Sequence, residues 1–272
     1  MRGIRFSMLI ALPFVLGGLY TGINLIYYGK DEHLFYLIPF FVVVLAIFFA
    51  KEEINYWYDE KFPPKLDREI VIWLQNFFPF YSTLDQNDRL KFDTRLALYL
   101  NARSFSLMLK EKKSIPEDFK SIIAAHGIQM TLGLKDFLIG DFDRIICYNH
   151  PFPTPQNKFL HTVEIHPEDG VILLSLETVM QSISKPNDNY NIAYHAYAEI
   201  LLSLYSEFNN VEAVDYSLIL PYSEDHILKL TGFTSLDPKV ISLATFFINN
   251  EGFKVNWPKE YATYAQILNY AY

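Results

Sequence analysis

The chain has 272 residues, 51% of them hydrophobic and 17% aromatic, with a net charge of −8. This composition excludes intrinsic disorder, which requires low hydrophobicity and high net charge. It also lacks the basic footprint of a nucleic-acid-binding protein, so we expect no nucleic-acid partner. A single cysteine excludes an internal disulfide framework and a thiolate zinc cluster.

Two uncharged segments near the N-terminus predict a membrane portion. Residues 6–28 form a run of 23 residues without a charge, and residues 34–50 form another of 17. At about 1.5 Å of rise per helical residue, the first run spans a hydrocarbon core of about 30 Å and the second is slightly short. Only residues 29–33 separate them. We therefore predict a transmembrane helical hairpin in residues 1–60, embedded in the lipid bilayer through residues 6–50.

The basic residues around the hairpin predict its orientation. They gather outside the two runs, at Arg2, Arg5, Lys51, Lys61, Lys65 and Arg68, whereas the turn contains only Lys30. Because Lys and Arg favour the cytoplasmic side, both termini and the soluble domain are predicted to be cytoplasmic, on a two-pass protein of the cytoplasmic (inner) membrane. Gly18 and Gly22 have the spacing of a close helix–helix contact, although glycine is common in membrane helices generally.

Residues 61–272 are expected to form one soluble domain of the α+β class. Helical patterns cover residues 67–77, 85–102 and 190–205, and further helices begin near Pro238, which Asp237 caps, and near Pro258. Ser114 to Glu117 reads as a capping box that opens a helix ending near Leu132. Short β runs cover residues 144–148, 162–165 and 171–175.

The helix over residues 191–205 is apolar on nearly every side, which is typical of a buried helix. Its two ionisable side chains before Glu207, His195 and Glu199, are four residues apart and so share one face. Burying both costs less if they bond to each other or to a metal ion. Two side chains at this spacing can bind a cation from one helical face, as the two histidines of His-Glu-x-x-His zinc sites do.

From about Phe78 to the C-terminus, the sequence resembles the Mlc titration factor A family of bacterial zincin-type zinc peptidases. The similar segments, in chain order, are residues 122–134, 145–152, 170–179, 191–199 and 257–270. The resemblance implies a zincin-like metallopeptidase fold, with helices and a small mixed sheet.

The same resemblance implies a degenerate active site. His195 matches the family's first zinc histidine, but Ala196 stands at the general-base glutamate and Glu199 at the second zinc histidine. Residues 236–250, where the family supplies a glutamate ligand, contain no glutamate; their one acid, Asp237, does not align securely. A catalytic zinc needs three protein ligands and a base for its water. We therefore predict no catalytic residues and no required cofactor, with His195 and Glu199 as the metal ligands if zinc is retained.

Other candidate residues have simpler interpretations. His161 and His166 are five positions apart, so on a strand they would face opposite sides, and we expect surface or loop histidines there; His150 is a third histidine that would have to approach His195 for a metal site. We expect His195 and Glu199 to form a buried hydrogen-bonded pair. Cys147 lies in an apolar β run and is expected to be an inert core thiol.

These observations favour a membrane-anchored pseudoenzyme that binds a protein partner, within or outside a membrane complex. The resemblance supports this hypothesis, because the best-known member of the family binds a transcriptional repressor through a surface separate from the zinc chemistry. The alternatives are a membrane-bound zinc peptidase with rearranged ligands and a structural subunit that associates through the hairpin.

Overall fold

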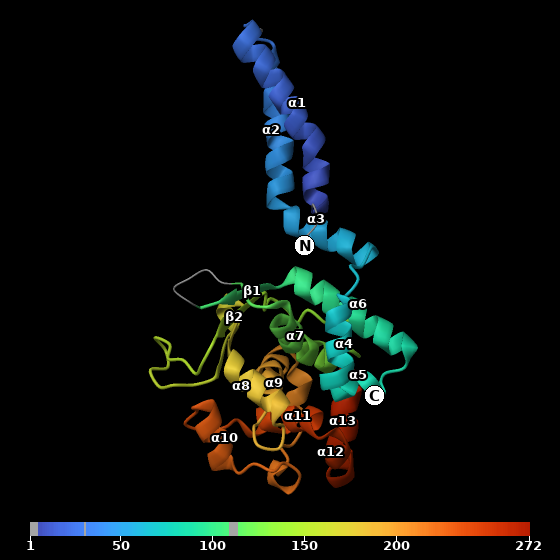
Figure 1. Cartoon of the computed structure of the whole chain (residues 1–272), viewed down its shortest axis with the longest axis vertical. Helices are drawn as coiled ribbons and strands as arrows, with labels where there is room; N and C mark the ends of the chain where they lie inside the picture. The colour runs from blue at the N-terminus through green and yellow to red at the C-terminus, as the bar shows by residue number, and fades with distance from the viewer. Residues whose placement is uncertain (1–4, 30, 109–113) are drawn as a thin grey trace. The chain divides into compact units, whose positions relative to one another are not determined.

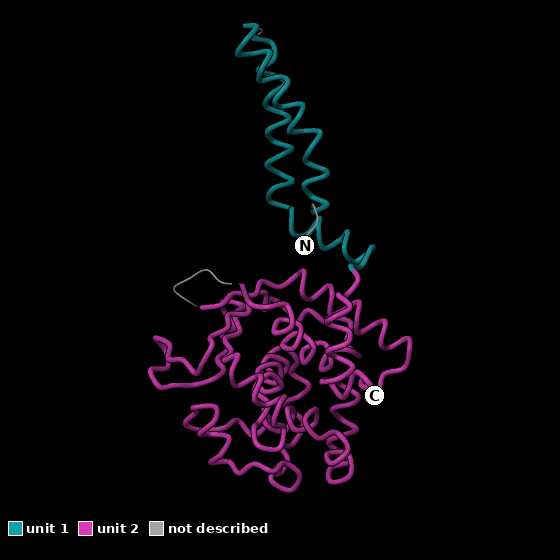
Figure 2. The backbone as a smooth tube through the Cα atoms, in the orientation of Figure 1, with its two compact units in different colours: residues 1–64 teal, residues 65–272 magenta. Residues whose placement is uncertain are grey.

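The computed structural model describes residues 5–29, 31–108 and 114–272, so Arg2 and Lys30, which entered the orientation argument, lie outside the described residues. The chain divides into two compact units, residues 1–64 and 65–272 (Figure 2). Each unit is described separately below.

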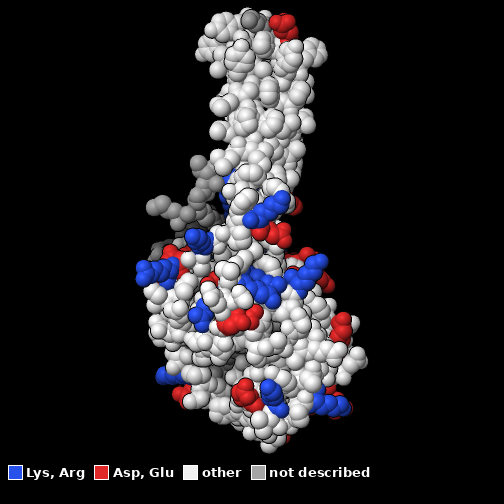
Figure 3. Space-filling model, turned by 90° about the vertical axis from the view of Figure 1, so that its right-hand side faces the viewer, with Lys and Arg blue, Asp and Glu red and all other residues white. Residues whose placement is uncertain are grey.

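The first unit consists of three helices: α1 (Phe6–Tyr28), α2 (His33–Phe49) and α3 (Lys51–Lys61) (Figure 1). Along α1 and α2 the visible surface is almost free of charged side chains (Figure 3). Within the described residues, α1 alone is long and apolar enough to cross a membrane; α2 meets the same criterion only when joined with α3, from which it is bent by 64°. The most buried side chains of α1 are polar: Ser7, Thr21 and Asn24.

A different glycine from the expected pair provides the close contact between α1 and α2. A Cβ on Gly17 would lie 2.6 Å from the ring of Phe40, so the ring requires a glycine there. Gly18 meets Phe40 only at 3.7 Å, and Gly22 has nothing within 4 Å. Gly22 therefore makes no close contact with α2.

The start of α1 is bonded to α3. Asn55 Oδ1 accepts a hydrogen bond from the Ser7 amide at 3.0 Å, and Arg5 forms an ion pair with Glu52 at 3.0 Å. The ring of Phe6 stacks on Tyr58 with centroids 4.3 Å apart. Since the first amides of a helix lack partners within the helix, the Asn55 side chain satisfies one of them.

The second unit contains a small mixed sheet and ten α-helices within the described residues, which confirms the α+β class predicted from the sequence. The strands have the order β1-β2-β4-β3, with β1, β2 and β4 parallel and β3 antiparallel to β4. The elements are α4 (Arg68–Phe77), α5 (Pro79–Thr83), α6 (Gln86–Ala102), β1 (Ser104–Leu107), α7 (Glu117–Thr131), β2 (Arg144–Tyr148), β3 (Val163–His166), β4 (Val171–Ser175), α8 (Leu176–Ser184), α9 (Ile192–Leu204), α10 (Glu224–Thr231), α11 (Pro238–Ile248), α12 (Asn250–Asn256) and α13 (Pro258–Leu268), with 3₁₀ turns η1 (Pro167–Asp169), η2 (Ser206–Asn210) and η3 (Tyr216–Leu218).

Helix α9 lies in the middle of this unit and contacts α7, α8, α11 and strands β3 and β4 (Figure 1). It is buried at every position from Ile192 to Ala198, as its apolar sequence predicted. Strand β4 is buried along its whole length, which is expected for a strand with neighbours on both edges and helices against it.

Two local expectations were wrong. Ser114 is not a cap: α7 begins at Glu117 after Pro116, the N-cap residue, which makes no side-chain hydrogen bond. Ile115 is buried, so the residues before α7 are fixed by packing instead. Strand β1 was not expected at all; its four residues pair in register with β2, and such a short polar-containing run has no distinct periodicity.

Candidate functional site

The N-terminus of α9 is fixed by polar contacts to α7. The Asn191 side chain caps α9, accepting from the amides of Ala193 at 3.0 Å and Tyr194 at 3.2 Å. Its Nδ2 donates to His126 Nε2 at 3.0 Å, while His126 Nδ1 donates to the Ile122 carbonyl at 2.8 Å. This pattern describes a neutral imidazole, and burial lowers the pKa of His126 to about 4. His126 is therefore a positioning residue for the helix that carries the predicted site.

Two further contacts fix the rotation of α9. The hydroxyls of Tyr99 and Tyr197 bond at 3.1 Å inside the core. The ring of Tyr197 lies so close to Gly127 of α7 that a Cβ there would be 2.8 Å from it. A glycine is consequently required at this crossing of α7 and α9, and the face bearing His195 and Glu199 has one orientation.

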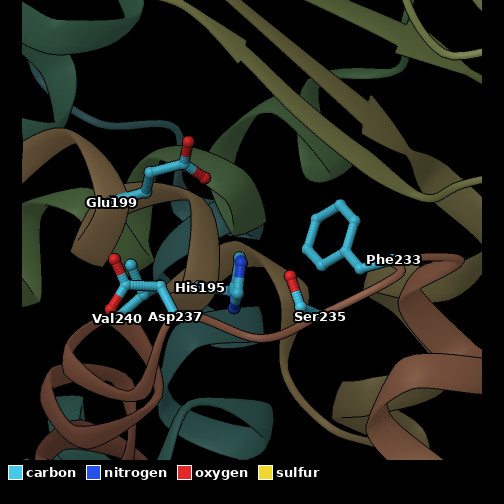
Figure 4. Close-up of a pocket in the computed structure, with 6 residues that line it drawn as sticks. All are labelled: His195, Glu199, Phe233, Ser235, Asp237 and Val240. Atoms are coloured by element: carbon cyan, nitrogen blue, oxygen red, sulfur yellow. The ribbon is translucent and has the colours of Figure 1, made fainter.

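A pocket of about 240 Å³ opens on this face of α9 (Figure 4). Its lining consists of His195, Glu199, Phe233, Ser235, Asp237 and Val240. The first two come from α9, Val240 comes from α11, and the others come from the segment between α10 and α11. Asp237 thus reaches the same pocket as the two predicted residues, although it could not be aligned with a family ligand from sequence.

His195 is 3% exposed, and its ring nitrogen Nδ1 forms a hydrogen bond with the Tyr190 hydroxyl at 3.1 Å. Phe233 packs beside it with ring centroids 5.4 Å apart. Burial lowers the pKa of His195 to about 4, and the charge of Asp237 opposes this shift only in part. At neutral pH the imidazole is uncharged.

Glu199 does not bond to His195. Its carboxylate points away from the imidazole (Figure 4), and within the described residues it forms neither a hydrogen bond nor an ion pair. The expected bonded pair is therefore wrong: His195 bonds to Tyr190, which directly precedes the helix cap. Burial, with the charge of Asp237 adding to it, raises the pKa of Glu199 to about 7.

The remaining candidates lie outside the pocket. His161 and His166 do not face opposite sides, because both bond to Glu164: His161 Nε2 to one carboxylate oxygen at 2.6 Å and His166 Nε2 to the other at 2.9 Å. Strand alternation failed here because His161 precedes the first residue of β3 and pairs with Phe152 instead. His161 is also fully buried, contrary to the surface position expected.

Two other side chains are readily assigned. His150 forms a surface pair with Glu177 at 2.7 Å. Cys147 is buried in β2, and burial raises the pKa of its thiol to about 12. A thiol with that pKa is not a nucleophile at neutral pH, as the apolar sequence around it predicted.

Residues 56–203 match the model of the glucose-regulated metallopeptidase M90 family, a segment that ends within α9 and includes His195 and Glu199. The chain belongs to this family. The match confirms the resemblance to the Mlc titration factor A family. No curated protein matches the sequence.

Members of this family are zinc metallopeptidases, so the pocket must be tested as a zinc site. Across the described residues, no three His, Cys, Asp or Glu side chains form a group able to hold a metal ion. His195, Glu199 and Asp237 share a pocket without forming such a group, and Asp237 Oδ1 already accepts from the Lys239 amide at 2.8 Å as the cap of α11. The residues present do not fit a catalytic zinc.

Proposed function

We propose that this M90 domain is catalytically inactive and acts as a binding module, attached to the membrane, for a protein partner or within a membrane complex. The observation that carries the proposal is the environment of His195. Its imidazole bonds to Tyr190, and the next residue, Ala196, is fully buried at the position where the family resemblance places the general base.

Hydrogen-bond accounting supports this assignment. Tyr190 is fully buried, and within the described residues the one partner of its hydroxyl is Nδ1 of His195. A hydroxyl hydrogen without an acceptor would cost about 1–3 kcal/mol, so the hydroxyl donates to Nδ1 and the ring proton is on Nε2. A protonated Nε2 faces a metal ion with a hydrogen instead of a lone pair, which opposes coordination.

The second deficiency is the absence of a carboxylate beside the water position. Removal of a general base typically lowers a rate by about 10²- to 10⁴-fold. Ala196 supplies no acceptor, and Glu199, with a pKa of about 7, is protonated in a large part of the molecules at neutral pH. These two features support an inactive site.

The first unit supports membrane attachment. In the most apolar part of α1, only 11% of the residues are buried, so this helix presents its apolar side chains outward, unlike the core helix of a soluble protein. A second span through α2, and cytoplasmic placement of both termini and of the M90 domain, follow from residue lengths and the positions of Lys and Arg. They are part of the proposal.

Metal analysis of the purified full chain, combined with a peptidase assay, tests the proposal. We expect neither stoichiometric zinc nor peptide hydrolysis, and the same result for His195→Ala. Stoichiometric zinc that disappears in His195→Ala, with hydrolysis lost in parallel, would overturn it. Glu207→Gln, an exposed residue just beyond α9, serves as the matched control that should leave both measurements unchanged.

The presence of Asp237 in the pocket favours a second candidate, a zinc peptidase with rearranged ligands His195, Glu199 and Asp237. This candidate requires Asp237 to coordinate the metal through the carboxylate oxygen that does not cap α11, and His195 to present the Nε2 lone pair. It predicts that Asp237→Asn lowers zinc affinity, whereas an inactive site predicts no zinc to lose.

A further inference from the structure

The segment between β2 and β3 forms an ordered loop outside the pocket. We call residues 153–160 the Phe159 loop. Its base is closed by Phe152 and His161, which exchange two backbone hydrogen bonds of 2.9 and 3.1 Å. Inside it, the Thr154 amide donates to the Asn157 carbonyl at 2.8 Å, and Asn157 Oδ1 accepts from the Phe159 amide at 3.2 Å. The loop thus has internal structure of its own.

The carboxylate of Glu164 ties this loop to the sheet. It accepts from Thr154 Oγ1 at 2.8 Å, in addition to the bonds from His161 and His166 described above. The other nitrogen of His161 bonds to the Phe159 carbonyl at 2.9 Å. One fully buried imidazole therefore links the loop backbone to a carboxylate on β3, which restricts the loop to one arrangement.

The loop displays apolar side chains instead of burying them. Phe159 is 74% exposed and Leu160 is 65% exposed, and the neighbouring Lys158 is exposed as well. The loop base is also braced from α10, since the backbone of Leu160 lies against Gly232 so closely that a Cβ would be 2.0 Å from its carbonyl oxygen. Because the loop is held in one arrangement, it presents Phe159 and Leu160 together at the surface, where a partner that covered both would bury apolar area.

The charge and composition of the loop favour a bilayer surface as that partner. The chain carries a net charge of −8, yet residues 151–161 contain no acidic residue and include Lys158. An aromatic and an aliphatic side chain beside a lysine is the combination found at the headgroup level of anionic membranes. The membrane anchor of the proposed function would keep the loop near a bilayer, so a weak contact suffices.

We propose that the Phe159 loop inserts Phe159 and Leu160 into the interface of an anionic bilayer, with Lys158 at the lipid phosphates. This contact would be a second attachment of the M90 domain to the membrane. It rests on the membrane anchor of the proposed function and is independent of whether the pocket binds zinc.

Site-directed spin labelling of the full chain in lipid nanodiscs tests this inference, because both faces of a disc are open to solvent. A nitroxide is placed at Phe159→Cys or Leu160→Cys, with Leu218→Cys in η3, 66% exposed, as the matched control. Cys147 is buried with a raised pKa and does not compete for the label. In discs containing phosphatidylglycerol, we expect the loop labels to collide with oxygen and to be protected from a water-soluble nickel chelate, while the control stays accessible to nickel.

The outcomes separate the loop from the anchor. A chain that does not enter discs overturns both proposals, whereas a chain that enters with loop labels as accessible to nickel as the control overturns only the loop contact. Protection that appears only in discs holding two chains indicates a contact between copies and also overturns it. Lys158→Glu should weaken the protection of the loop labels in phosphatidylglycerol discs and leave it unchanged in purely zwitterionic discs. If the variant and the wild type are equally protected in phosphatidylglycerol discs, the role of Lys158 is refuted.

Discussion

Replacing Glu199 by glutamine measures how much folding free energy the ionised carboxylate costs in the pocket. The pKa of Glu199 is raised from 4.5 to about 7, mainly because the carboxylate is buried, with Asp237 adding to the shift. The folded state therefore binds this proton more tightly than the unfolded state, and folding stability falls as the pH rises from about 4.5 through about 7. At about 1.36 kcal/mol for each pKa unit, the charged carboxylate costs roughly 3 kcal/mol of folding free energy above pH 7.

Glutamine has the same shape and no charge, so Glu199→Gln should remove this cost. Near pH 5 the wild-type carboxyl is protonated, and the two proteins should have similar melting temperatures. Near pH 8.5 the variant should be more stable by up to about 3 kcal/mol, which corresponds to roughly 6–12 °C for a domain of this size.

The assay is thermal unfolding of the full chain in detergent, followed by circular dichroism at pH values from 5 to about 8.5, the range that brackets the Glu199 pKa. Glu207→Gln provides the control, since that glutamate is exposed and its replacement should shift the melting temperature little at any pH. The reasoning is refuted if Glu199→Gln has the same effect at pH 5 and at pH 8.5. A variant that is less stable at high pH would show instead that the ionised carboxylate has a favourable partner, such as a metal ion.

Three further predictions concern residues around α9. Tyr190→Phe removes the hydroxyl that holds the ring proton of His195 on Nε2, so the affinity of this site for zinc should rise by about tenfold. Competition with a chromophoric chelator measures the affinity, and an unchanged value would contradict the tautomer assignment. Because the pKa of buried His126 is lowered to about 4, the folded state loses stability as the pH falls from about 6.5 to 4, and His126→Gln should show a shallower loss in a pH series of melting temperatures. Gly127→Ala places a methyl group against the Tyr197 ring and should lower the unfolding free energy by about 1–3 kcal/mol in chemical denaturation, whereas Gly22→Ala, with open space around it, should not.

Sequence patterns predicted the elements whose signals are local. Helix α9 was predicted from its continuous apolar residues, and the structure buries it as expected, although Asn191 proves to be its cap and not its first residue. Asp237 was predicted to cap α11, and it does so through the Lys239 amide. Both predictions depend on contacts within a few residues along the chain, which is why a single sequence was enough.

The features that failed depend on contacts distant in sequence or on the exact start of an element. The pocket joins α9 to residues 233–240, and no local pattern indicates that these segments meet. Strand alternation was applied to His161 although β3 begins two residues later, so the convergence on Glu164 was missed. The bond from Tyr190 to His195 was missed because Tyr190 lies outside the helix and helical spacing says nothing about its direction.

The apolar surroundings of α9 determine the charge state of His195 and Glu199 in the pocket. Apolar neighbours make ionisation costly, and they lower the pKa of His195 while raising that of Glu199. Between about pH 4, the pKa of His195, and about pH 7, the pKa of Glu199, both groups are therefore largely uncharged. Zinc coordination requires an ionised carboxylate, so the raised pKa of Glu199 opposes it, whereas an uncharged imidazole such as that of His195 is the form that a metal ion binds. In the proposed inactive site, Ala196 offers no proton acceptor and the apolar surroundings of Glu199 disfavour the ionised carboxylate that a metal ligand requires.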